Sequence, residues 1–74
     1  MNGSEAFTTP IHGRPGSIYR GDADPANQVG AVYRYGTKWL AFHGDEPGVA
    51  FEWWNEACEF VVFRAQGWTE AVTP

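Results

Sequence analysis

Two runs of strand-forming residues joined by a glycine turn constrain the fold of this chain more than any other feature. Residues 28–35 (QVGAVYRY) and 37–43 (TKWLAFH) are rich in β-branched and aromatic residues, which favour strands. Gly36-Thr37 between them fits a two-residue hairpin turn with glycine first. Such a turn fixes the register of the two strands near 29–35 and 37–43. The predicted pairs are Tyr35 with Lys38, Tyr33 with Leu40, Ala31 with Phe42, Arg34 with Trp39, and Val32 with Ala41.

A third strand is predicted near 49–53, after the loop signal GDEPG at 44–48. A five-residue loop would place Val49 opposite His43, Phe51 opposite Ala41 and Trp53 opposite Trp39. One sheet face then carries Val32, Trp39, Ala41, Val49, Phe51 and Trp53. Its large apolar residues Trp39, Phe51 and Trp53 make it the drier face, so we assign them to the core. The other face carries Tyr33, Tyr35, Lys38, Leu40, Phe42 and Glu52.

Residues 55–66 (NEACEFVVFRAQ) favour a helix, because four end signals agree. These are Asn55 as N-cap, Glu56 in the first turn, Arg64 in the last turn and Gly67 just past the end. A strand over 60–63 (FVVF) and a longer helix over 45–66 are the alternatives. The sequence thus predicts an α+β fold, with a small antiparallel three-stranded sheet packed on one C-terminal helix near 55–66.

The first third of the chain is interrupted by proline and glycine, so residues 1–16 are interpreted as a flexible N-terminal arm and 17–74 as one small domain. Residues 17–20 could form a short strand. The arm could instead fold over the tyrosine-bearing sheet face through Phe7 and Ile11, together with Ile18 and Tyr19. Residues 69–74 could add an edge strand or fray.

Charge and composition indicate the class of partner. The net charge is −4 and the five basic residues are scattered, whereas a nucleic-acid-binding domain usually carries a clustered basic stripe. The acidic balance therefore favours a protein partner. One cysteine allows no intramolecular disulfide, and the sequence shows neither a signal-peptide pattern nor a run of membrane-span length. We therefore expect a cytoplasmic protein without a membrane partner.

No set of residues in the sequence has the spacing of a catalytic or metal site. The soft metal ligands are His12, His43 and Cys58, and they share no pair spacing of the kind that zinc sites use. Cys58 is expected to be a small buried apolar residue. Ser4 and Ser17 lie outside any nucleophile-elbow context. We therefore expect no enzyme activity, no metal and no cofactor.

The aromatic content of 16% is the most informative feature for function. A helix covers only one face of a sheet, so the second face would stay open, and exposed aromatic patches usually mark contact surfaces. The predicted binding residues are Tyr33, Tyr35, Lys38, Leu40, Phe42 and Glu52. We interpret the chain as a stoichiometric protein-binding module, such as a phage or mobile-element accessory protein that inhibits a host or defence complex. A homo-oligomeric structural protein is an alternative.

Residues 33–42 (YRYGTKWLAF), followed by a loop, a strand and the helix candidate, carry a resemblance. Over about half of the chain, the arrangement resembles the N-terminal arm-type DNA-binding domain of phage tyrosine integrases, in which an Arg/Lys-rich hairpin precedes a Trp-x-Ala segment. The residues that match in type and order are Arg34, Lys38, Trp39 and Ala41. The resemblance implies a sheet packed on a helix. It also implies, as an alternative function, nucleic-acid binding by the 31–43 hairpin through Arg34 and Lys38.

Overall fold

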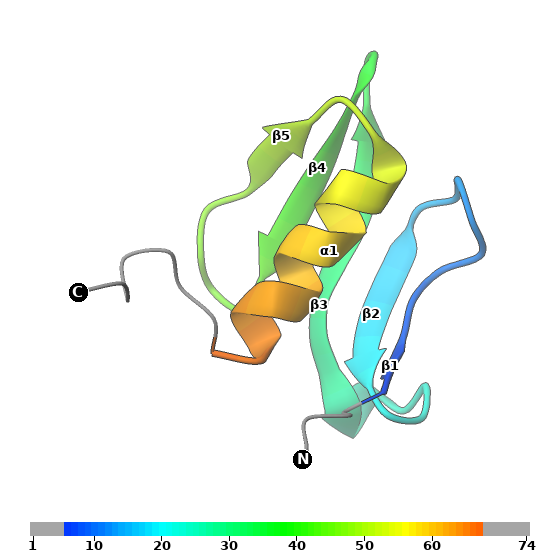
Figure 1. Cartoon of the computed structure of the whole chain (residues 1–74), viewed down its shortest axis with the longest axis vertical. Helices are drawn as coiled ribbons and strands as arrows, with labels where there is room; N and C mark the ends of the chain where they lie inside the picture. The colour runs from blue at the N-terminus through cyan, green and yellow to red at the C-terminus, as the bar shows by residue number, and fades with distance from the viewer. Residues whose placement is uncertain (1–5, 68–74) are drawn as a thin grey trace.

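The fold is a two-layer α+β arrangement, in which one helix lies across one face of an antiparallel sheet (Figure 1). The computed structural model describes residues 6–67. The strands are β1 (Phe7–Thr8), β2 (Gly16–Arg20), β3 (Gln28–Tyr35), β4 (Lys38–His43) and β5 (Val49–Phe51). A 3-10 turn, η1 (Pro25–Asn27), precedes β3, and the helix α1 spans Trp54–Ala65. The α+β class with a C-terminal helix is therefore confirmed.

The sheet has five strands, so the prediction of three was wrong. Its strands are antiparallel and follow the order of the chain, β1-β2-β3-β4-β5. The short strand expected at 17–20 is confirmed as part of β2, which pairs with β3, and Phe7–Thr8 pairs in turn with the end of β2. The Thr8 hydroxyl donates to the Gly21 carbonyl, and the Gly21 amide donates to the Ala6 carbonyl. Residues 6–20 thus extend the sheet sideways.

The register of the β3–β4 hairpin is confirmed pair by pair. Tyr35 lies opposite Lys38, Arg34 opposite Trp39, Tyr33 opposite Leu40, Val32 opposite Ala41 and Ala31 opposite Phe42. Gly36 has a φ of +62° in the turn, a left-handed conformation that favours glycine. The two-residue turn therefore sets which side chains face α1 and which face away.

The register of β5 was predicted wrongly by two residues. Val49 lies opposite Ala41 and Phe51 opposite Trp39, because Phe42 and His43 continue β4 beyond its last pair with β5, so that residues 42–48 rather than 44–48 separate the paired residues. Glu46 in this loop forms an ion pair with Arg64 of α1, which holds the loop toward the helix end. A slip of two residues preserves the alternation of the strand, so Val49 and Phe51 keep their predicted face.

The helix over 54–65 excludes the predicted alternatives of a strand at 60–63 and of a helix starting near 45. Its N-cap is Trp53 rather than Asn55, and no side chain caps it. Trp53 therefore leaves the strand before it can reach the core, and 62% of its surface is exposed. Glu56 in the first turn and Arg64 in the last turn are confirmed. Gly67 follows the helix with a φ of +81°, as expected for the residue past its end.

The core lies between α1 and the sheet face that it covers. Its fully or almost fully buried members are Ile18, Val32, Trp39, Ala41, Ala57, Cys58 and Val61. Phe7, Phe51 and Phe60 pack at its margin. No helix among residues 6–67 has the length and apolarity needed to cross a bilayer. The predictions for residues 69–74 lie outside the described residues.

Candidate binding surfaces

The sheet face opposite α1 carries the aromatic side chains that were predicted to bind a partner. We call this surface the open face and define it by Tyr33, Tyr35, Leu40 and Phe42. The alternation of β3 and β4 turns these residues away from the helix. Tyr33 and Tyr35 are 48% and 69% exposed, while Leu40 and Phe42 are half-buried. The Tyr33 and Phe42 rings meet edge to face with centroids 5.9 Å apart. The open face is therefore a continuous aromatic and aliphatic surface.

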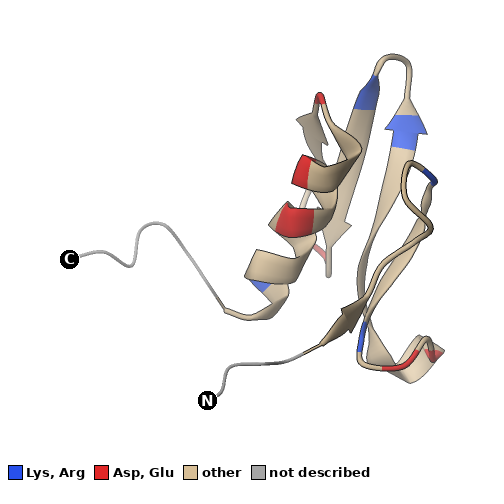
Figure 2. Cartoon of the chain, turned by 45° about the vertical axis from the view of Figure 1, so that its right-hand side comes forward, with Lys and Arg blue, Asp and Glu red and all other residues tan. Residues whose placement is uncertain are grey.

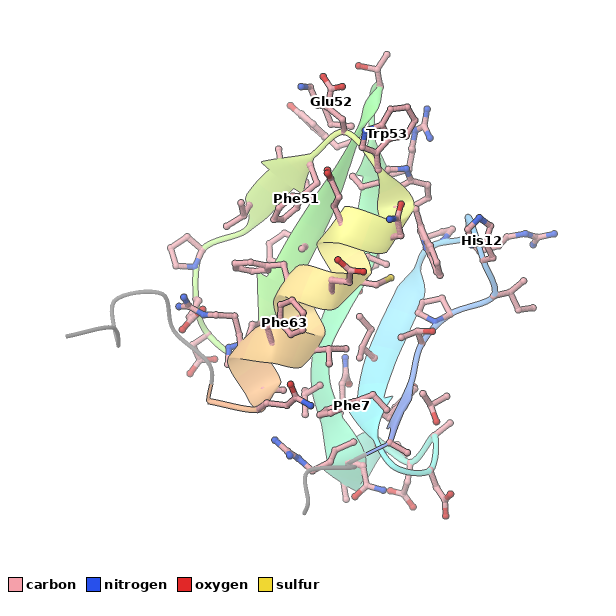
Figure 3. The ribbon with its side chains drawn as sticks, viewed as in Figure 1. Phe7, His12, Phe51, Glu52, Trp53 and Phe63 are labelled. Atoms are coloured by element: carbon pink, nitrogen blue, oxygen red, sulfur yellow. The ribbon has the colours of Figure 1, made fainter. Side chains whose placement is uncertain are left out.

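Residues 6–20, the part of the N-terminal region that the structure describes, leave Tyr33 and Tyr35 of the open face exposed. Ile18 is fully buried in the core, and Phe7 packs against the core margin near the C-terminal half of α1 (Figure 3). Ile11 is 77% exposed. Of the four side chains expected to fold over this face, Phe7 and Ile18 thus pack in or beside the core and Ile11 is exposed. Tyr19 is half-buried on β2.

Lys38 and Glu52 border the open face at its hairpin end. The Lys38 Nζ lies 3.3 Å from a Glu52 carboxylate oxygen, and both side chains are largely exposed. A pair this exposed contributes little to folding stability. The structure thus brings together all six predicted binding residues on one side or at one end of the β3–β4 hairpin.

A second surface, which we call the hairpin-end groove, lies around the β3–β4 turn. This open depression of about 560 Å³ is lined by three segments that are distant in sequence: the loop at His12, the hairpin with Arg34 and Lys38, and the β5–α1 junction with Trp53. Trp53 and Glu52 stand at this end of the molecule, with His12 on the neighbouring loop (Figure 3). The groove therefore combines aromatic and charged groups.

Hydrogen bonds and ring contacts hold the walls of the hairpin-end groove. The Trp54 Nε1 donates to the Arg14 carbonyl at 2.8 Å, and the His12 ring meets the Trp54 ring edge-on at 4.7 Å. The Arg34 guanidinium lies over the Trp39 ring at 5.2 Å, and its Nε donates to the Gly36 carbonyl at 2.9 Å. Within residues 6–67, the terminal nitrogens of Arg34 have no partner, so they remain available to a ligand.

The fold gathers basic residues that are scattered in the sequence. Arg34 and Lys38 flank the hairpin turn, and Arg14 lies beside Trp54 through its carbonyl. Figure 2 shows basic positions on both strands next to the β3–β4 turn, an acidic position between β5 and α1 at the same end, and further acidic positions on α1. The hairpin-end groove is thus lined by two cationic side chains, Arg34 and Lys38, and by one carboxylate, Glu52.

The sequence analysis missed Trp53 as a surface residue. It placed Trp53 in the core because strand alternation was continued through residue 53. A helix starting at residue 54 interrupts that alternation, and the N-cap position turns the side chain outward. The adjacent Trp53 and Trp54 at the start of the helix were the available signal, since two neighbouring residues of a strand point to opposite faces and cannot both enter the core.

Glu46 connects the β4–β5 loop to the end of α1. One of its carboxylate oxygens lies 2.8 Å from Arg64 Nη2, and the other lies 3.5 Å from His43 Nδ1. The hydrogen bond from Arg64 is the largest cause that holds the pKa of Glu46 below its usual value of 4.5. Glu46 and His43 thus take part in contacts that join the β4–β5 loop to the end of α1.

Cys58 lies on the buried face of α1 and belongs to the core, as expected. Burial, with a smaller contribution from the charge of Glu59, raises the pKa of the Cys58 thiol to about 11. A neutral, buried thiol is a poor nucleophile. In the part of the chain described here, no three His, Cys, Asp or Glu side chains are grouped so that they could hold a metal ion.

Comparisons with models of known protein families, with curated proteins and with solved structures found no match for this chain.

Proposed function

We propose that this chain is a non-catalytic module that binds a protein partner through its open face. The observation that carries the proposal is the exposure of Tyr33 and Tyr35 beside Leu40 and Phe42, on a sheet face that α1 leaves uncovered. Tyrosine is enriched in protein interfaces because its ring is apolar while its hydroxyl can pair at the edge of a contact.

Rigidity supports this proposal. The four side chains stand on the two longest strands, which are joined by a two-residue turn and pair from Gly30–His43 to Tyr35–Lys38. A rigid aromatic surface loses little conformational entropy on binding, so more of the contact energy is retained as affinity. Such a stoichiometric module could serve as an accessory protein of a phage or mobile element that inhibits a host or defence complex.

The test is affinity capture from a lysate of the organism that encodes the protein, quantified against a double Tyr33→Ser, Tyr35→Ser variant. Ile11→Ser is the matched control, because Ile11 is 77% exposed and lies outside the open face. Loss of two central aromatic contacts should reduce recovery of a specific partner by at least about tenfold. Equal recovery by the double variant and the control would refute the proposal, provided that both variants have the circular dichroism of the wild type.

Self-association is measured in the same set of experiments. Light scattering at two widely separated concentrations distinguishes a second copy of the chain from another partner. A dimer that the double tyrosine variant abolishes would make the open face a homo-oligomeric interface. A strict monomer excludes that alternative.

A further inference from the structure

We propose that the hairpin-end groove binds a nucleotide unit, with the base stacked on Trp53 and the phosphate held by Arg34 and Lys38. This inference concerns a different surface from the open face and does not depend on it. The volume of about 560 Å³ lies within the usual range for sites that take small molecules or one unit of a polymer.

Trp53 offers an exposed aromatic ring to a ligand in the groove. A tryptophan with 62% of its surface exposed contributes little to the core, yet it lines a groove that is built from three separate segments. Bases stack on exposed aromatic rings with little dependence on sequence, because every base has a π face. The N-cap position fixes the backbone of Trp53 between β5 and α1, so the ring is presented from a rigid junction.

The charged side chains of the groove favour an anionic ligand. Its walls carry two cations, Arg34 and Lys38, against one carboxylate, Glu52. Glu52 pairs with Lys38 at 3.3 Å, which leaves Arg34 as the uncompensated cation. The ring contact with Trp39 and the Nε bond to Gly36 fix the Arg34 guanidinium, whose planar fork matches a phosphate. These charges favour an anionic ligand over a neutral sugar, which would also stack on an indole.

The α1 N-terminus adds to the positive potential without carrying the proposal. The helix has twelve residues and begins at the groove, and no side-chain hydrogen bond caps its first turn. Partial positive charge at such an end favours anions nearby. Glu56 stands in the first turn of α1 and offsets part of this charge.

Fluorescence anisotropy at low salt tests the proposal, with the full chain and a labelled short single strand of thymidylate. Trp53→Ala should weaken binding by roughly 5- to 100-fold, the range expected for loss of one stacked base. Phe63→Ala is the control, because it removes a 46% exposed aromatic ring from α1 outside the groove. Arg34→Gln should weaken binding and reduce its dependence on salt.

A variant that should bind more tightly gives a second readout, which impaired folding cannot imitate. Glu52→Gln removes the groove carboxylate and frees Lys38, so affinity should rise about two- to fivefold. Glu59→Gln removes the same charge from an exposed position on α1 and should have a smaller effect. Equal effects of Glu52→Gln and Glu59→Gln would show that net charge, rather than the groove, governs binding, and would overturn the proposal.

Competition then identifies the source of the nucleotide. If adenosine monophosphate displaces the strand and binds with the same dependence on Trp53, a free nucleotide suffices; if only the strand binds, the ligand is single-stranded nucleic acid. Tighter binding of duplex with no effect of Trp53→Ala would overturn the stacking model. Binding of maltotetraose alone, or of none of these probes at millimolar concentration, would overturn the assignment of a nucleotide.

Discussion

Gly30 lies on β3 beneath α1, where the structure leaves no room for a methyl group. A Cβ at this position would overlap the Phe42 carbonyl oxygen of the neighbouring strand and would lie 2.6 Å from Val61 Cγ1 of the helix. Gly30→Ala must therefore move β4, α1 or both. Overpacking of a filled core costs about 1–3 kcal/mol, and we expect about 3 kcal/mol here because one neighbour is backbone.

This cost converts to a large change in melting temperature. In a domain of 60–100 residues, 1 kcal/mol corresponds to roughly 4–8 °C, so Gly30→Ala should lower the Tm by about 12–24 °C. Thermal unfolding followed by circular dichroism measures the change. Gly44→Ala is the matched control, because its Cβ meets nothing within 4 Å and only its φ of +56° opposes the substitution. The control should cost about 1 kcal/mol, partly offset by the stiffer unfolded chain.

A second substitution tests the mechanism of the Gly30 effect. Val61→Ala removes the Cγ1 contact but leaves the Phe42 carbonyl in place. The destabilisation of the Gly30→Ala, Val61→Ala double variant should therefore be smaller than the sum of the two single destabilisations. It should still exceed that of Val61→Ala alone, because the overlap with the Phe42 carbonyl remains. Additive effects, or a Tm for Gly30→Ala equal to that for Gly44→Ala, would refute the close packing of α1 on β3.

Two further predictions concern groups with shifted pKa values. With its pKa raised to about 11, only about a thousandth of Cys58 is thiolate at pH 8. A thiol reagent should therefore react with the folded chain far more slowly than with the chain unfolded in urea. Rapid reaction of the folded chain would contradict the buried position of Cys58. Since the folded pKa is raised, the associated stability should be lost as the pH rises from about 9 to about 11. Because the pKa of Glu46 is lowered, its stabilisation should be present above its usual value of 4.5 and lost as the pH falls below it. Glu46→Gln should therefore lower the Tm at pH 7 and have no effect at about pH 2, as a pH series of melting curves would show; a difference independent of pH would contradict the ion pair with Arg64.

The part of the fold that was predictable from sequence is the part set by local rules. A two-residue turn leaves one register for the strands beside it, so the pairs from Tyr35–Lys38 to Ala31–Phe42 could be named in advance. The last turn of the helix was also predictable from Arg64 and Gly67. The open face followed from the same alternation, since Tyr33 and Tyr35 alternate with residues that face α1.

The features that were missed depend on contacts between distant residues. The β5 register depends on where pairing with β4 ends, at Ala41 and Val49, and the loop beyond it contacts the distant end of α1 through Glu46 and Arg64. Strand β1 has only two residues and exists through its pairing with β2. The hairpin-end groove required His12, Arg34 and Trp53 to converge from three segments. Trp53 is exposed because α1 begins at Trp54, whereas the sequence predicted a helix beginning at residue 55.

The order of the strands in the sheet has a consequence for how the chain folds. Because every strand pairs with its neighbours in sequence, each pairing closes only a short loop, and the entropy lost in closing it is small. The β3–β4 hairpin can form first, on the microsecond scale typical of such hairpins, and offers an edge on each side for the next strand. At similar stability, proteins dominated by local pairings fold faster than proteins dominated by pairings between distant residues. The sheet can thus grow outward from its centre, and α1 closes the core on a surface that is already assembled.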